Sequence, residues 1–323
     1  MKKKILLLLC SFVVIYLVNF TIPRLMPGDP FDYQSAAAGE ESSTEMTEEL
    51  KEYLRAYYGL DKPFFAQLWQ NIKNNLRGDL GYSIHYKHPV SELLMERLPW
   101  TAFIMFTTLA LSLILGTALA LLGLRRKKAD GCLYALFSVL WELPHFLVGI
   151  LLLFLVAARV DWIPLSGAVT AFGIYYSEWD WIGDVLLHAL MPIAALTLVT
   201  IPGFYFTARA SFISIIERPY VLAARAKGLR EGRIRLHYVF RNALPPIVAR
   251  FFLSVGAAIG GTMLIENVFA YPGLGTVMRE AVKYRDYPLI QGVFLLSTVL
   301  VLMSLFIADM INDINDRRKG GSL

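Results

Sequence analysis

The sequence is poor in charged residues and in cysteine. Only 18% of its 323 residues are Asp, Glu, Lys or Arg, whereas 56% are hydrophobic. A water-soluble domain of this length needs more polar surface, so the composition favours a protein that lies in a membrane. The two cysteines, Cys10 and Cys132, are too few for a disulfide framework and have no metal-binding spacing.

Two further absences narrow the possible functions. The chain has no Gly-x-x-x-x-Gly-Lys-Ser/Thr segment, so it does not itself hydrolyse a nucleotide through a phosphate loop. No small-x-small cleavage site follows the first apolar run, which extends from Ile5 to about Pro23. We therefore expect this run to be a retained span and not a secretory signal peptide.

Long apolar runs predict an all-α integral membrane protein. A hydrocarbon core about 30 Å thick needs roughly 20 helical residues to cross it. Runs of this length predict six transmembrane helices, at about Ile5–Pro23, Thr101–Leu124, Leu133–Ala158, Ile182–Ala208, Ile247–Phe269 and Leu289–Ile311.

Basic residues predict the orientation of these spans. With six spans, Lys2-Lys3-Lys4, Arg125-Arg126-Lys127-Lys128, the segment 209–250 and Arg317-Arg318-Lys319 all lie on one side. The segment 209–250 alone has nine basic and two acidic residues. Because cytoplasmic loops carry the excess of Lys and Arg, we expect both termini in the cytoplasm.

The sequence between the first two spans is too long for a simple turn, and it predicts an external cap. Thr44–Gly59 has apolar residues at helical spacing, with Thr44 or Thr47 to cap its start and Gly59 to end it. Ala36–Ser43 is small and polar and predicts a loop.

The basic segment after the fourth span predicts a short helix with an accessible surface. Pro219 suits the first turn of a helix, alanines extend it and Gly228 ends it. A second helix, Glu231–Asn242, is expected to lead to a break at Pro245-Pro246. Small residues let another surface approach closely, although an ordinary basic inner loop would carry the same charges.

This segment also carries a resemblance to a known family. Tyr220-Val221-x-x-Ala224-Arg225-Ala226-Lys227-Gly228-Leu229, followed by Arg241-Asn242-Ala243-Leu244, resembles the coupling loop of permeases in the dipeptide/oligopeptide/nickel family of ABC importers. The other motifs that resemble this family, in chain order, are Pro27-Gly28-Asp29-Pro30, Gly78-Asp79-Leu80-Gly81-Tyr82-Ser83, Pro89-Val90, Arg97-Leu98-Pro99-x-Thr101, Pro144-x-Phe146, Trp162-Ile163-Pro164-x-Ser166-Gly167, Glu266-x-x-Phe269, Pro272-Gly273-Leu274-Gly275, Asp286-Tyr287-Pro288 and Asp309.

The resemblance implies a fold, a role and partners. The fold is that of a type I ABC importer permease, with residues 1–23 as the first span, 24–100 as an extracytoplasmic loop and cap, 101–311 as a five-helix core and 312–323 as a cytoplasmic tail. It implies a coupling loop at 209–246 that docks on cytoplasmic ATPase subunits. The coupling residues would be Tyr220, Ala223, Ala224, Arg225, Ala226, Lys227, Gly228, Leu229, Arg241 and Asn242.

The same resemblance implies that the chain binds no cofactor or metal and catalyses no reaction. Two ATPase subunits would use ATP and Mg, a second, related permease would complete the pathway, and an extracytoplasmic binding protein would deliver the substrate. The location would be the cytoplasmic membrane of a prokaryote, and no nucleic acid is involved.

Ionisable residues inside the spans are candidates for the substrate pathway, because a charge at membrane depth is costly unless it faces a cavity or a partner. Glu142 and His145 are three apart and could share a helix face, and Pro144 between them can kink the helix. They could bind a peptide amine or a chelated metal, or form an internally satisfied pair. Glu266 could serve an outer gate or a structural role.

Substrate and mechanism have alternatives at this level. We expect import of di- or oligopeptides, with a nickel or other metal chelate as the alternative cargo. An ion-coupled secondary transporter is a different class, but it would need inverted repeats or broken helices beside charged sites, and we find neither in the sequence. An intramembrane enzyme would need paired aspartates or a third metal ligand beside Glu142 and His145, and neither is present. His85 and His88 have metal-ligand spacing but no third ligand nearby.

Overall fold

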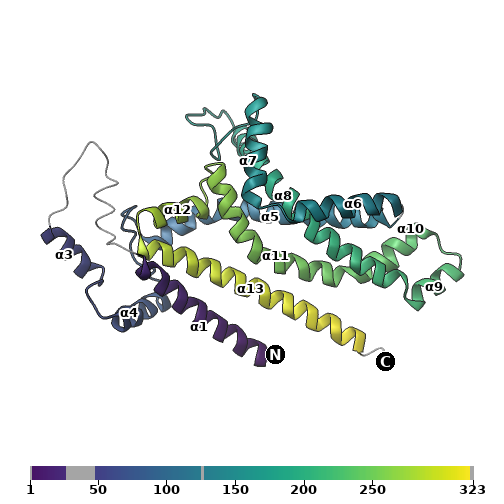
Figure 1. Cartoon of the computed structure of the whole chain (residues 1–323), viewed down its shortest axis with the longest axis horizontal. Coiled ribbons are helices and arrows are strands. Elements are labelled where there is room, and N and C mark those ends of the chain that lie inside the picture. Colours follow the sequence, from purple (N-terminus) through teal and green to yellow (C-terminus); the bar gives the residue numbers. More distant parts are fainter. Residues whose placement is uncertain (1, 27–47, 125–126, 321–323) are drawn as a thin grey trace. The chain divides into compact units, whose positions relative to one another are not determined.

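The computed structural model describes residues 2–26, 48–124 and 127–320, and almost all of its regular structure is helical (Figure 1). Within these described residues, five helices are long and apolar enough to cross a membrane. They are α1 (Lys2–Leu25), α5 (Val90–Gly123), α8 (Glu178–Ile216), α11 (Arg241–Val268) and α13 (Tyr287–Gly320). A sixth span is formed if α6 (Lys127–Trp141) and α7 (His145–Leu155), which meet at a bend of 100°, are counted together. The expected six-span, all-α fold is confirmed.

The described chain divides into two compact units. The first consists of Met1–Pro99 and Gly273–Val299, and the second of Trp100–Pro272 and Leu300–Leu323. Helices α5 and α13 each contribute to both units.

The described residues of the first unit form short helices besides the spans, namely α3 (Glu48–Tyr57), α4 (Phe64–Leu76) and α12 (Leu274–Lys283). Helix α3 is the described part of the predicted helix Thr44–Gly59, and it ends as expected at Gly59. Gly59 has φ +66°, and Leu60 N–H donates to the Arg55 carbonyl, 2.9 Å. The motif Pro27–Pro30, the loop Ala36–Ser43 and the caps Thr44 and Thr47 lie outside the described residues. Helices α4 and α12 were not predicted, because they are too short to read as spans.

Helices α5, α8 and α11 form the core of the second unit. Gly116 of α5 marks a close helix crossing, since a Cβ atom there would lie 2.8 Å from Phe204 Cβ and 2.9 Å from the backbone nitrogen of Tyr205 on α8. The backbone of α8 cannot move aside as a side chain can. The close approach of α5 and α8 therefore requires glycine, which has no side chain, at position 116.

Replacing Gly116 by valine should destabilise the protein by about 3 kcal/mol, because overpacking against a backbone cannot be relieved by a rotamer change. The matched control is Gly260→Val on α11, where a Cβ atom would meet nothing within 4 Å. We expect the control to change the free energy of unfolding far less. Denaturant unfolding of both variants in detergent micelles measures the difference, and equal effects would refute the tight crossing.

Helix α8 begins earlier than predicted, at Glu178 instead of Ile182. Ser177 forms a capping box with Asp180, with hydrogen bonds of 3.0 and 3.2 Å. His188 lies inside this helix. It is buried, with Nδ1 2.9 Å from the Asp184 carbonyl oxygen.

The predicted break at Pro245-Pro246 is wrong. The chain stays helical from Glu231 to Val268 through α10 (Glu231–Arg233), a π-helical segment (Ile234–Phe240) and α11, which contains both prolines. Prolines are tolerated inside spans where local π adjustments re-satisfy the backbone groups that they free. The π-helical segment lies directly before α11.

Candidate functional site

The segment between α8 and α10 forms the expected short helix, α9 (Pro219–Ala226), with Pro219 in its first turn. At its end Gly228 adopts φ +71°. Gly228 N–H donates to the Arg225 carbonyl (2.9 Å) and Leu229 N–H to the Ala224 carbonyl (3.3 Å). These two bonds form a Schellman motif, which requires a left-handed residue at the glycine position.

One face of α9 packs inward and the other is open. Val221 and Ala224 are buried in a cluster with Ile234 and Val239 of the π-helical segment, and Leu229 packs against it. Ala224, expected to receive a partner surface, therefore packs within the chain's own core. We call the open face the α9 surface, and it consists of Tyr220, Leu222, Ala223, Ala226, Lys227 and Gly228.

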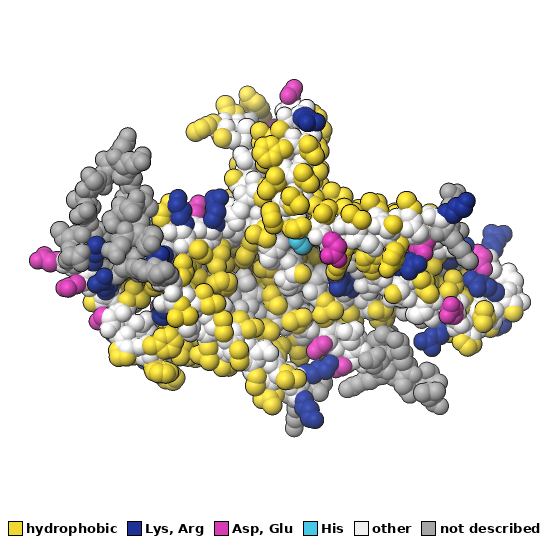
Figure 2. All heavy atoms as spheres, in the orientation of Figure 1, with side chains coloured by type: hydrophobic (Ala, Val, Ile, Leu, Met, Phe, Trp, Pro, Cys, Tyr) yellow, Lys and Arg dark blue, Asp and Glu magenta, His cyan; other side chains and the backbone are white. Residues whose placement is uncertain are grey.

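The surroundings of the α9 surface are held by polar contacts. Arg225 Nε lies 2.9 Å from Glu231 Oε1 and connects α9 to α10. Asn242 Nδ2 donates to the Tyr238 carbonyl (2.6 Å), and the neighbouring Arg241 is exposed. Helices α9 and α10 lie beyond the ends of α8 and α11 (Figure 1), and Lys and Arg side chains gather over this end (Figure 2).

An ion pair that the sequence analysis missed connects α6 to α8. Asp130 accepts two hydrogen bonds from the Arg209 guanidinium, 2.7 and 2.6 Å, and a third from the Tyr205 hydroxyl, 2.9 Å. Bidentate pairs of this kind fix orientation as well as position. An acidic residue two positions after the basic run 125–128 is the signal that could have identified it.

The chain leaves the helix at residues 142–144, so the expectation that Glu142 and His145 share a helix face is wrong. Pro144 does interrupt the span as expected, directly before α7. Glu142 is exposed in the break. His145 opens α7 and packs on α11, where its Cδ2 lies 3.1 Å from the position of a Cβ atom on Gly261.

A second ionisable residue, Arg250 of α11, lies close to this break. Its guanidinium carbon is 5.5 Å from the centre of the Trp141 ring. Both side chains occupy the space beside Gly203 on α8, where a Cβ atom would lie 2.5 Å from Arg250 Nη2 and 2.7 Å from Trp141 Cζ3. Arg250 Nε is buried and has no hydrogen-bond partner among the described residues. The crossing of α6, α8 and α11 thus carries a cation in a span.

Glu266 lies in the interior of the second unit. Its side chain is fully buried, and its carbonyl accepts from Tyr271 N–H, 2.8 Å. Tyr271 packs edge-on against Trp100, with ring centres 5.8 Å apart. Burial, and to a lesser degree the Glu266 carboxylate, raise the pKa of the Tyr271 hydroxyl. The role of Glu266 in an outer gate stays a prediction.

Motifs that are distant in the sequence meet within each unit. In the second unit, Gly167 N–H donates to the Phe269 carbonyl, 2.9 Å.

In the first unit, the buried Asp286 accepts from the Ser83 hydroxyl (2.5 Å) and from His85 N–H (2.9 Å). Burial raises the pKa of the Asp286 carboxyl, and these hydrogen bonds oppose the change. The His85 ring stacks on Tyr284 at 3.8 Å.

Apolar spans, a short accessible helix between two of them and ionisable groups at a broken span define a multi-span membrane transport subunit. A profile of the family described as "Binding-protein-dependent transport system inner membrane component" matches residues 112–321. The chain belongs to this family.

Similar proteins agree with this assignment. The chain is 30% identical over 311 residues to the oligopeptide transport system permease protein AppB of Bacillus subtilis, covering 94% of this chain and 93% of that protein. It is 31% identical to the glutathione transport system permease protein GsiC of Pectobacterium atrosepticum, covering 96% and 94%.

A solved structure supports the fold. The inward-facing MetNI methionine ABC transporter superposes with a TM-score of 0.56 at 17% identity, covering 69% of this chain and 96% of that chain. The resemblance to the ABC importer permeases is thus confirmed, and the chain is a permease subunit of a binding-protein-dependent importer. This membership decides against a secondary transporter and against an intramembrane enzyme.

Proposed function

We propose that the chain forms, with a second permease, an alternating-access pathway for di- and oligopeptides delivered by a binding protein. The similar permeases named for oligopeptide and for glutathione, itself a tripeptide, support peptide over a nickel chelate as cargo. Energy comes from two partner ATPase subunits that use ATP and Mg, while this chain binds no cofactor.

The α9 surface is the observation that carries this proposal. It presents the exposed side chains of Tyr220 and Leu222 beside small residues, outside the buried core. A groove on an ATPase subunit could enclose such a short helix closely at Ala223, Ala226 and Gly228. The orientation that follows has both termini in the cytoplasm of a prokaryote and the first unit's short helices outside.

The break between α6 and α7 is our candidate for the pathway. Irregular backbone at membrane depth is tolerated only where it is buried in protein or lines a water-filled cavity. Glu142, Pro144 and His145 lie at this break, and Arg250 lies near it. These groups offer both charge signs to a peptide that has a free amine and a free carboxylate.

ATP-dependent uptake tests the proposal. The chain should be purified with its neighbouring subunits, reconstituted in vesicles and supplied with a peptide pool or with nickel. We expect peptide uptake that requires ATP and stops when the ATPase subunits are left out. Uptake of nickel but not of peptides would mean that the importer carries a nickel chelate. Uptake without ATP would contradict the proposed mechanism.

A further inference from the structure

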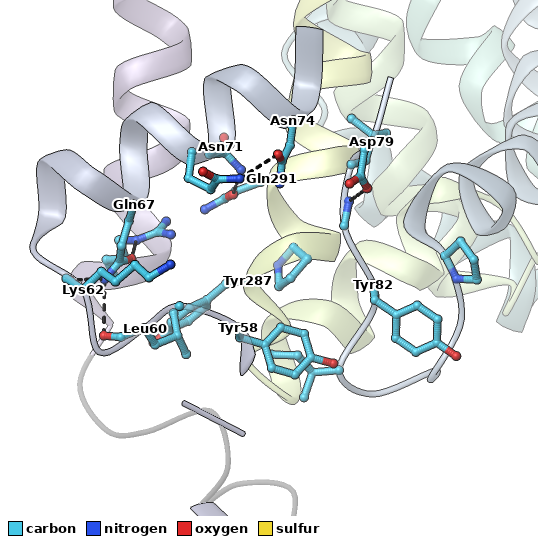
Figure 3. Close-up of a pocket in the computed structure, with 18 residues that line it drawn as sticks. Tyr58, Leu60, Lys62, Gln67, Asn71, Asn74, Asp79, Tyr82, Tyr287 and Gln291 are labelled. Atoms are coloured by element: carbon cyan, nitrogen blue, oxygen red, sulfur yellow. Dashed lines mark hydrogen bonds between the residues drawn. The ribbon is translucent and has the colours of Figure 1, made fainter. Parts of the chain in front are cut away.

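A polar cavity lies within the first unit (Figure 3). It encloses about 470 Å³, a volume in the range of small-molecule sites. Residues from α1, α4, the loop before α5 and the start of α13 line it. It is large enough for a peptide of a few residues.

One wall of the cavity is a stripe of carboxamides on α4. Gln67, Gln70, Asn71 and Asn74 follow each other at positions i, i+3, i+4 and i+7, so they share one helix face. Gln291 of α13 faces them, and Asn71 Nδ2 donates to Gln291 Oε1 (3.1 Å). A carboxamide has both a donor and an acceptor, as a peptide bond does. Gln67 and Asn71 are hydrogen-bonded within the protein at both ends, and Gln70 Nε2 donates to Asn74 Oδ1, 3.0 Å. Gln70 Oε1 and Asn74 Nδ2 are therefore the acceptor and the donor that the described part of this stripe offers to an extended main chain.

Gln291 points to a missing ligand. Its Nε2 is buried and has no hydrogen-bond partner within the described part of the chain. A buried donor without a partner costs about 1–3 kcal/mol. This nitrogen has no surface open to the cavity, so a carbonyl or carboxylate oxygen would reach it once the Gln291 side chain turns outward.

Opposite charges stand on opposite sides of the cavity. Lys62 lies at the side of Gln67, and Asp79 lies across the cavity from it (Figure 3). Arg24 belongs to the Lys62 side, because its Nε donates to Gln67 Oε1, 2.9 Å, while Gln67 Nε2 donates to the Lys62 carbonyl, 2.8 Å. Asp79 is held by a hydrogen bond from Gly81 N–H to its Oδ1, 2.9 Å.

The remaining walls are apolar and aromatic. Tyr58, Leu60, Tyr82 and Tyr287 lie around the lower part of the cavity as drawn in Figure 3. Aromatic walls with a few polar groups are typical of ligand sites, and they accept side chains of varied size.

We propose that this cavity binds a short peptide with free termini. Its main chain lies along the carboxamide stripe, its carboxylate near Arg24 and Lys62, and its amine near Asp79. The inference rests on the proposed function, in which α4 and the start of α13 lie on the outer side of the membrane, and it makes the cavity a holding site for cargo at the outer ends of α1 and α13.

Binding of trialanine to the full chain in lipid nanodiscs tests the inference by calorimetry, without ATP or partner subunits. The double variant Gln70→Leu/Asn74→Leu should weaken binding at least tenfold. Lys73→Leu is the matched control, since Lys73 is exposed on the same helix and does not line the cavity. Trialanine with acetylated and amidated ends should also bind more weakly, because it lacks both charges.

The outcomes distinguish a failure of the proposed peptide site from a failure of the proposed transport function. Absence of saturable binding, or equal binding by the double variant at unchanged thermal stability, would overturn the cavity site. If ATP-driven peptide uptake persists in that case, the proposed function stands alone. Should the double variant unfold, the single variant Asn74→Lys provides the test, since its ammonium would lie on the Asp79 side, where it should repel the peptide amine and weaken binding by a similar factor.

Discussion

Replacing Gly228 by tryptophan is expected to reduce ATP-driven uptake at least a hundredfold while the chain still folds. A Cβ atom at Gly228 would meet nothing within 4 Å, so the side chain would project from the α9 surface without disturbing the core. The left-handed conformation costs a non-glycine residue roughly 1–2 kcal/mol. The indole would nevertheless prevent close approach of an ATPase subunit, and vesicle uptake measures the loss.

The control for Gly228→Trp is Gly228→Asn. Asparagine tolerates the left-handed region better than other side chains, and it is small. We expect this variant to assemble and to transport at a rate within a few-fold of the wild type. If the tryptophan variant transports equally well, the α9 surface is not the site where the ATPase docks.

Replacing Asp286 by alanine is expected to destabilise the protein by about 3–5 kcal/mol, because it leaves buried donors without an acceptor. The carboxylate accepts from Ser83, from His85 N–H and from Leu289 N–H in the first turn of α13, 3.1 Å. The Asp286 carboxylate therefore both caps the start of α13 and holds the loop before α5. Denaturant unfolding in micelles measures the change.

Two further variants support the assignment of this effect. Ser83→Ala removes one partner only and should cost about 1 kcal/mol. Glu92→Ala removes an exposed acid of the same unit, 3.5 Å from His88, and should change stability by less than about 1 kcal/mol. A comparable loss for Glu92 and Asp286 would mean that the buried contacts do not determine stability.

The positions of the spans could be predicted because lipid imposes a minimum apolar length on a helix that crosses it. The ends of α3 and α9 could be predicted because glycine adopts the left-handed region more readily than any other residue. Gly59 and Gly228 both end helices as expected. The capping box at Ser177 was also present in the sequence, and its use would have corrected the start of α8.

Other features depend on contacts that local sequence does not encode. Ser83 and Asp286 are 203 positions apart, and only the folded unit brings them together. Pro144 indicated a kink, but the angle between α6 and α7 follows from packing, such as that of His145 against α11. The inward orientation of Ala224 likewise required the position of the π-helical segment, which has no simple sequence signal.

Helix α1 differs from the other long helices in how it is stabilised. Its most apolar window has a mean hydropathy of 2.6, and only 6% of that window is buried by protein. A span so apolar is stable in lipid before it packs on other helices. Its insertion during synthesis therefore need not wait for the rest of the protein, whereas α8, 61% buried in the corresponding window, reaches its final environment only when its neighbours have been inserted too.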